Sequence, residues 1–190
     1  MSMRAMSWAV VALLVAALLV TGGCPKKVKQ IGEAARVAQD AQDGNFTVKG
    51  EKGEEFKFES KGGDADSGKM TVTGPDGQKS TTESGADAVK PEDVGIDFYP
   101  GATVEGGTKS SVTGEKGGAF AQVTLTTKDP LDKVASFYKG KYAEGNTVMD
   151  APGSCVIVFG EGENKGKMIS VTEEKGEGLT RILISAGSGM

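Results

Sequence analysis

Residues 119–143 read AFAQVTLTTKDPLDKVASFYKGKYA, and this stretch decides the predicted fold. Its first nine residues alternate apolar and polar side chains. This alternation predicts a half-buried strand with Ala121, Val123 and Leu125 on one face. The residues that follow have the spacing of an amphipathic helix. We therefore expect a strand that leads directly into a helix.

The ends of the predicted helix carry the expected signals. Asp129 is expected to cap the helix, and Pro130 suits its first position. Asp132 favours the positive end of the helix dipole, whereas Lys139 and Lys141 favour the negative end. The apolar face that would lie on the sheet comprises Leu131, Val134, Ala135, Tyr138 and Tyr142.

Three further strands follow the helix, separated by turns rich in Gly, Glu, Lys and Asn. They read SCVIVFG (154–160), GKMISVTEE (166–174) and LTRILISA (179–186). Short strands joined by such turns are typical of an antiparallel meander. We predict that residues 94–190 form an α+β domain, in which an antiparallel β-sheet meander packs on one main α-helix.

Residues 44–93 are predicted to form β-hairpins that precede this domain. Four segments alternate in character and are bounded by Gly-rich turns such as GPDG. One face of the small sheet is lightly apolar, and the opposite face carries Lys, Glu and Thr. The residues expected on the apolar face are Phe46, Val48, Phe56, Phe58, Met70 and Val72.

The amino-terminal 23 residues have the organisation of an export signal. Arg4 supplies a positive charge, and an apolar run of 13 residues follows from Trp8 to Val20. This length suits a signal peptide, because a helix that spans a bilayer needs about 20 apolar residues. Three small residues then lead to Cys24.

The small residues before Cys24 resemble the lipobox of bacterial lipoproteins, although Thr21 stands where that family usually has Leu or another aliphatic residue. The resemblance implies a diacylglyceryl group on the Cys24 sulfur and cleavage of residues 1–23. Several acyl chains on one residue would hold the protein on a membrane, because each buried CH₂ contributes about 0.8 kcal/mol. The alternatives are an ordinary cleaved secretory signal and an uncleaved anchor.

Residues 24–43 are predicted to form the lipid anchor and a short helical tether. Val28, Ile31, Ala35 and Ala38 recur at spacings near 3.5 residues, but two of these four are small. A spacer between the membrane and the folded part accounts for this pattern. The alternative is a partner helix, which normally presents more large apolar side chains.

The composition disfavours several classes of function. The chain has no histidine, which excludes a His-containing zinc site and any Ser-His-Asp or Cys-His arrangement. Its formal net charge of −4 gives no support to nucleic-acid binding. With Cys24 lipidated, Cys155 would be a single thiol, which we expect to be buried in a strand rather than reactive.

Two acidic groups are candidate sites. Asp64 and Asp66 resemble the start of a calcium loop, but its glycine comes one position early and its twelfth position is Pro75. We expect a solvated turn there. The second group consists of glutamates in the last turns of the chain. A pair of catalytic carboxylates, as in glycosidases, lies in a concave pocket, whereas we expect these residues at exposed hairpin tips. The members of this second group are Glu161, Glu163, Glu173, Glu174 and Glu177.

The sequence also contains YPGA at residues 99–102, followed by T-x-D-P-x-x-x-V-x-x-F-Y over residues 127–138. This pattern resembles one found in uncharacterised bacterial envelope lipoproteins, a family with no assigned activity. Each of these residues also suits a turn, a cap or a core face.

We therefore expect a lipid-anchored cell-envelope protein that is not an enzyme and that contacts another envelope component. We expect no catalytic, cofactor or metal residues, and a location at the outer membrane, facing the periplasm or the exterior, rather than at the inner membrane. The alternative is a periplasmic module that binds a small ligand or lipid in a cavity. Four aromatic residues are candidates for its lining, namely Phe120, Phe137, Tyr138 and Tyr142.

Overall fold

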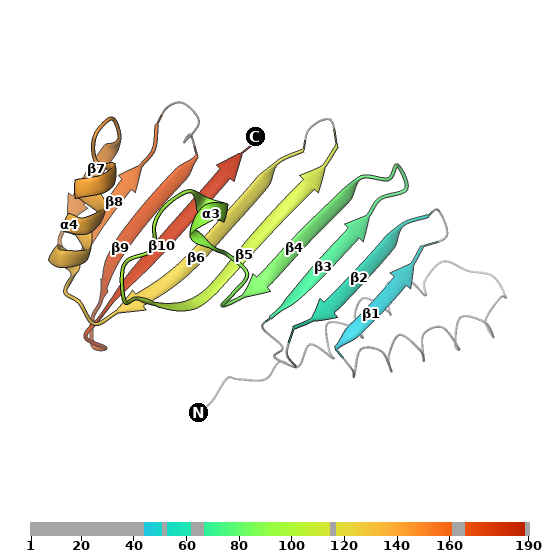
Figure 1. Cartoon of the computed structure of the whole chain (residues 1–190), viewed down its shortest axis with the longest axis horizontal. Coiled ribbons are helices and arrows are strands. Elements are labelled where there is room, and N and C mark those ends of the chain that lie inside the picture. Colours follow the sequence, from blue (N-terminus) through green and yellow to red (C-terminus); the bar gives the residue numbers. More distant parts are fainter. Residues whose placement is uncertain (1–43, 51–52, 62–66, 115–116, 161–165, 189–190) are drawn as a thin grey trace. The chain divides into compact units, whose positions relative to one another are not determined.

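The computed structural model describes residues 44–50, 53–61, 67–114, 117–160 and 166–188. These residues form ten strands and two helices (Figure 1). The chain divides into two compact units, with the boundary between Gly77 and Gln78. The predicted signal and tether, including Cys24, lie outside the described residues.

The first unit contains three antiparallel strands, β1 (Asn45–Lys49), β2 (Glu55–Ser60) and β3 (Gly68–Thr73). The predicted shared face is confirmed, because Phe46 pairs with Phe58, which pairs with Met70. The Phe46 ring stacks at 5.5 Å on both Phe56 and Phe58. In the described part of this unit no residue is fully buried.

The second unit contains seven antiparallel strands in the order β4-β5-β6-β10-β9-β8-β7. The chain runs from β6 through a helix to the far edge of the sheet and returns strand by strand until β10 pairs with β6. The strands are β4 (Lys79–Gly85), β5 (Thr103–Thr113), β6 (Ala119–Thr127), β7 (Thr147–Ala151), β8 (Ser154–Val158), β9 (Lys167–Glu174) and β10 (Leu179–Ser188).

The core lies on one face of this sheet, which we term the inner face. Strict alternation along the strands places β-branched residues and leucine there, fully buried, as with Val123, Leu125 and Ile182. Helix α4 (Leu131–Tyr142) packs on β8 and β9. Helix α3 (Pro91–Val94) lies over β6 and β10 (Figure 1).

The segment around α3 completes the covering layer. Its apolar residues Val89, Val94, Ile96 and Tyr99 are all buried against the inner face. Contacts of Asp97 join this segment to α4, since Lys141 lies 2.9 Å from the Asp97 carboxylate and the Tyr142 hydroxyl accepts a hydrogen bond from the Asp97 amide at 3.0 Å.

The predicted α+β fold, with a meander packed on one main helix, is wrong. The described residues are mainly antiparallel sheet, with two helices of only 4 and 12 residues. The expected helix forms, but it covers only the β8 and β9 end of the inner face. Irregular chain around α3 covers a further part of this face. The sequence could not reveal this segment's role, because its buried side chains follow no helical or strand period.

The predicted cap of α4 is also wrong. Pro130, not Asp129, occupies the N-cap position, and no side chain caps the helix. The Asp129 carboxylate is instead bound to two other groups. It accepts a hydrogen bond from the Tyr99 hydroxyl at 2.7 Å and lies 2.9 Å from the Lys133 ammonium.

Candidate functional site

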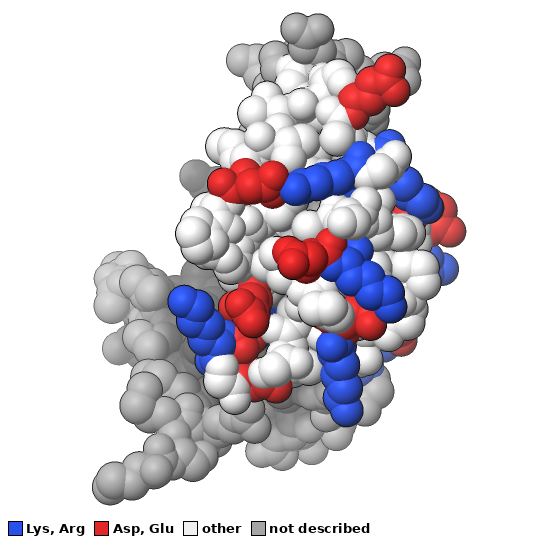
Figure 2. Space-filling view, turned by 90° about the vertical axis from the view of Figure 1, so that its left-hand side faces the viewer, with Lys and Arg blue, Asp and Glu red and all other residues white. Residues whose placement is uncertain are grey.

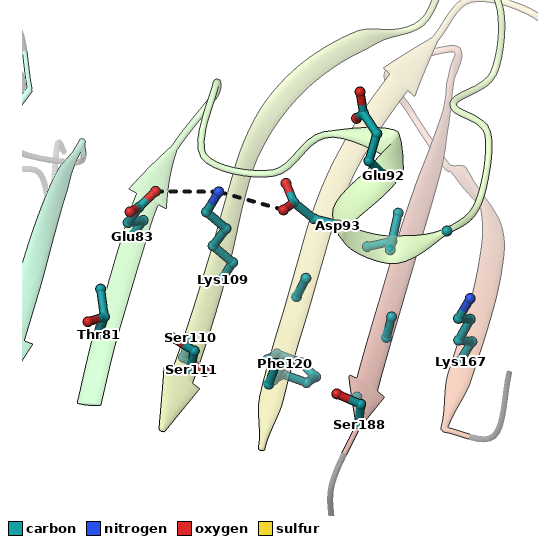
Figure 3. A pocket seen from close by; sticks show the side chains of 16 residues that line it. Thr81, Glu83, Glu92, Asp93, Lys109, Ser110, Ser111, Phe120, Lys167 and Ser188 are labelled. Atoms are coloured by element: carbon teal, nitrogen blue, oxygen red, sulfur yellow. Dashed lines mark ion pairs between the residues drawn. The ribbon is translucent and has the colours of Figure 1, made fainter. Parts of the chain in front are cut away.

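A groove of about 340 Å³ lies at one end of the inner face of the second unit. Strands β4, β5, β6 and β10 provide its floor, and α3 forms one wall (Figure 3). It begins where the covering layer ends, so part of the inner face stays open to solvent. Of the sequence-predicted site residues that the structure describes, only Phe120 borders this groove.

Lys109 joins the floor of the groove to the wall formed by α3. Its ammonium lies 3.5 Å from the Glu83 carboxylate on β4 and 3.6 Å from the Asp93 carboxylate on α3 (Figure 3). Glu83 meets Lys109 because the β4–β5 register pairs these two residues directly. Asp93 is held in place by a hydrogen bond at 2.8 Å from the Lys90 amide.

The Lys109–Asp93 pair links β5 to α3, whereas the Lys109–Glu83 pair links two neighbouring strands. The side chains of Lys109, Glu83 and Asp93 are each about one-third exposed, at 36%, 31% and 29%. Water therefore screens their attraction, and pairs of this kind contribute little to stability. The Lys109 ammonium nevertheless neutralises part of the negative charge of Glu83 and Asp93.

Small side chains form the floor of the groove. Ala119 and Ala121 on β6 lie beside Ala186 and Ser188 on β10. Phe120 also borders the groove, but strand alternation directs its ring to the opposite face of the sheet. The floor is therefore flat and only weakly apolar.

Lys167 on β9 forms the wall opposite Lys109 (Figure 3). Its ammonium closely approaches Gly95, where an added Cβ would lie 2.5 Å from the Lys167 nitrogen. Gly95 follows α3 with a φ of 61°, which glycine adopts readily. The groove thus offers amines, carboxylates and hydroxyls, which can hold a small polar molecule by hydrogen bonds.

The YPGA and TxDP residues come together in a second cluster. Pro100 and Gly101 form a tight turn in which the Ala102 amide donates to the Tyr99 carbonyl at 3.1 Å. Gly101, the third of the four turn residues, has a φ of 78°, the positive value that this position requires when proline precedes it. The turn directs Tyr99 toward Asp129, to which its hydroxyl donates.

Hydrogen bonds shift both pKa values in this cluster. The hydrogen bond from Tyr99, aided by Lys133, holds the pKa of the Asp129 carboxyl below its usual value. The same hydrogen bond raises the pKa of the Tyr99 hydroxyl. The Thr180 hydroxyl donates to the Asp129 carbonyl at 2.8 Å, which joins β10 to the start of α4. These contacts give the cluster a structural role.

Three of the four candidate cavity-lining aromatic residues lie in the core or pack against it instead. Phe137 packs edge-on against both Tyr99 and Tyr138, with ring centroids 5.2 and 5.0 Å apart. Tyr142 stacks on Tyr138 at 6.4 Å and contacts Phe159 at 5.8 Å. These rings contact one another and the core, and none of the three borders the groove.

The Tyr138 hydroxyl is fully buried, and burial raises its pKa well above the usual value. Among the described residues this hydroxyl has no hydrogen-bond partner, and the nearby Tyr99 backbone only partly offsets the effect of burial on its pKa. The ring itself is completely enclosed. Tyr138 therefore serves packing, and its hydroxyl is not accessible from the groove.

Cys155 lies in β8 with 1% of its surface exposed, as predicted. Burial, with a hydrogen bond to the Asp150 carboxylate, raises the pKa of its thiol. A protonated, enclosed thiol is a poor nucleophile.

The acidic groups do not converge in the described part of the chain. Glu174 pairs with Arg181 at 2.8 Å, and no group of three or more potential metal ligands occurs among the described residues. Asp64, Asp66, Glu161 and Glu163 lie outside the described residues.

Comparisons with known proteins identify no relative. No protein-family model, curated protein or solved structure matches this chain. In the described ranges, neither helix has the length and apolar character needed to cross a bilayer. The resemblance to envelope lipoproteins therefore stays a prediction from the sequence.

Proposed function

We propose that this protein is a lipid-anchored component of the bacterial cell envelope that acts by binding another envelope component, without catalysis. The observation that carries this proposal is the outer face of the second unit's sheet, opposite the inner face. No described helix packs on this face. Leu183 lies near its centre, and the side chains around it include eight half-exposed hydroxyls and one half-exposed amide. They are Thr82, Ser84, Thr108, Ser110, Gln122, Thr124, Ser170, Thr172 and Ser185.

Such a face favours an interaction surface over a reaction site. It is broad, because seven strands contribute to it. Hydroxyl and amide groups lose little by exposure to water and can form hydrogen bonds across a protein interface. A concave pocket with converging polar groups would instead favour a small ligand.

Charge distribution around α4 supports a protein partner over a nucleic acid. Figure 2 shows Lys and Arg intermixed with Asp and Glu on the side of the molecule that it presents. Each of three lysines of α4 has an acidic partner: Lys133 with Asp129, Lys139 with Asp150, and Lys141 with Asp97. Binding to phosphates needs clustered, unpaired basic groups.

Replacing the proposed lipid attachment site tests the anchor. The Cys24→Ser protein should move from the membrane to the soluble fraction, and the intact mass of the native protein should include a diacylglyceryl group. A native protein of unmodified mass that washes from vesicles would contradict the anchor.

Site-specific photo-crosslinking in cells tests the outer face. A photoreactive residue at Gln122 or Ser170 should give an adduct with the same partner, because both side chains lie on this face. The matched control is Ser136, which is exposed on α4 away from this face. Equal adducts from Ser136, or none from Gln122 and Ser170, would contradict the proposal.

The groove favours a second function, binding of a small polar ligand. Native mass spectrometry of the full chain tests it, since a carrier retains a bound mass. Ala119→Trp, which places a large side chain on the groove floor, should abolish that mass. Val112→Trp, at an exposed position on the outer face, should retain it. If the native protein carries no added mass, this second function is wrong.

A further inference from the structure

Strand β7 is an edge of the second unit's sheet. It pairs with β8 on one side and ends the strand order on the other. Four of its five residues are exposed. An edge of this kind presents backbone groups that can pair with another strand.

The hydrogen-bond pattern shows which backbone groups of β7 face outward. The Glu173 amide donates to the Gly153 carbonyl at 3.0 Å, which makes Ser154 and Thr172 a non-hydrogen-bonded pair in β8–β9. The backbone groups of Ser154 therefore face β7. By alternation along β7, Ala151, Met149 and Thr147 bond to β8, so the amides and carbonyls of Val148 and Asp150 face outward.

Two features that usually protect sheet edges are weak here. Asp150 carries the only charge in β7, and the Lys139 ammonium lies 2.7 Å from its carboxylate. Pro152 lies in the turn after the strand, so it removes no amide from the edge. Neither residue prevents an incoming strand from pairing with Val148 and Asp150.

The edge is continuous with an apolar patch on the outer face. Met149 is 50% exposed, the largest value among the exposed large hydrophobic residues described. It pairs with Val156, and Val158 pairs with Met168 on the next strand. Leu183 on β10 lies on the same face. We term Met149, Val156, Val158, Met168 and Leu183 the outer apolar patch.

We propose that β7 pairs with β7 of a second copy of this chain, antiparallel and with Met149 on the two-fold axis. Val148 of each copy then exchanges backbone hydrogen bonds with Asp150 of the other, which uses the outward-facing groups of both strands. The two Met149 side chains meet on the outer face and join the two outer apolar patches. The two Asp150 carboxylates stay apart, each beside its own Lys139.

A second copy suits this edge because the strand complements itself. In the proposed register, Thr147 faces Ala151, Val148 faces Asp150, and Met149 faces Met149, so no like charges stand directly opposite. A shift of the β7–β7 register by one residue would place Met149 of one copy on the inner-face side of the other. The inference does not depend on the lipid anchor.

Disulfide trapping tests the register on the full chain carrying Cys24→Ser, in detergent solution. Met149→Cys should form a disulfide-linked dimer, because a non-hydrogen-bonded pair has its Cα atoms about 4.5 Å apart. Thr147→Cys is the matched control on the same strand and face. Its two copies would lie about 13 Å apart in the proposed register, too far for a disulfide. Cys155 does not interfere, since it is buried.

The two cysteine variants distinguish the outcomes. A dimer from Met149→Cys alone supports the proposal, and mixing Thr147→Cys with Ala151→Cys should give a mixed dimer. Equal trapping of Met149→Cys and Thr147→Cys, or trapping of neither, overturns it. These measurements need no membrane, so a failure of the anchor leaves their meaning unchanged.

A charged residue at position 149, on the proposed two-fold axis, provides an independent test that needs no disulfide bond. Met149→Lys brings two ammonium groups together and should weaken self-association at least about tenfold in sedimentation experiments. Val112→Lys is the matched control, because Val112 is similarly exposed, at 43%, but lies on β5. Equal association constants for the two variants would overturn the proposal.

Discussion

The sheets of the two units have the same sequence pattern and different degrees of burial. In the first unit, Phe46, Phe56 and Phe58 stack on one face, yet none is fully buried. In the second unit, Val123 and Ile182 occupy equivalent alternating positions and have no exposed surface. Alternation thus determines which face is apolar. Complete burial requires a second layer over that face.

The second unit obtains this layer from two segments of the chain. Helix α4 covers β8 and β9, and the segment around α3 covers β6 and β10. The described part of the first unit has three strands and no helix of its own. A sheet of three strands with one lightly apolar face is close to the limit of independent stability.

Because burial differs between the two sheets, we expect the most destabilising substitution at Ile182, in the centre of the inner face. Ile182→Ala should lower the free energy of unfolding of the second unit by about 2–5 kcal/mol, because it leaves a cavity in a fully buried position. Chemical denaturation of the full chain measures this change.

Val72→Ala in the first unit is the control, since 38% of Val72 is exposed. Its effect should be below about 1 kcal/mol. If both substitutions destabilise equally, the difference between the two sheets is not one of burial.

A second substitution tests how closely the covering layer approaches β5. A Cβ added at Gly107 would lie 2.9 Å from the Val89 side chain, whereas one at Gly106 would meet nothing within 4 Å. Gly107→Ala should destabilise the second unit by about 1–3 kcal/mol, as overpacking does. Gly106→Ala should change the same denaturation midpoint much less. Equal changes in the midpoint for the two variants would show that the covering layer can move away from Gly107 without loss of stability.

The sequence predicts much of the sheet because the strands near the core alternate strictly. Strand β6 has the predicted bounds, and Ala121, Val123 and Leu125 are buried as expected. Helix α4 follows, since Pro130 and the apolar spacing mark its start and its inner face. These are local signals, and they remain valid in any tertiary arrangement.

The covering layer could not be predicted by the same means. Val89, Val94, Ile96 and Tyr99 are buried at irregular spacings because each meets a different part of the sheet. Asp129 has the sequence position of a cap, but the Tyr99 hydroxyl, 30 residues earlier, binds its carboxylate. The groove depends on the β4–β5 register that brings Lys109 to Glu83, and no local pattern specifies that register.

A third substitution tests whether the first unit depends on its aromatic stack. Phe46→Ala removes both ring contacts and should cost about 1–2 kcal/mol. Hydrogen exchange should accelerate in β1 and β2, while the amides of β6 and β10 keep their protection. Faster exchange in β6 and β10 as well would show that the two units unfold together.

The smallest predicted effect concerns the hydrogen bond that ties the covering layer to the start of α4. Because the pKa of Asp129 is lowered, its contribution to stability is present above the unfolded value of about 3.9 and is lost as the pH falls through the folded value. Because the pKa of Tyr99 is raised, its contribution is present below about 10 and is lost as the pH rises through the folded value. The bond therefore stabilises the second unit between these limits.

Tyr99→Phe should flatten both ends of the stability–pH profile, measured by denaturation from pH 2 to pH 11. The Tyr99 hydroxyl is the largest cause of the Asp129 shift, so the acid limb should lose most of its slope at this site. Tyr142→Phe is the control, because Asp97 owes its lowered pKa mainly to Lys141 and only slightly to the Tyr142 hydroxyl. An acid limb that changes equally in both variants would mean that the bond from Tyr99 to Asp129 does not specifically hold the covering layer on the sheet.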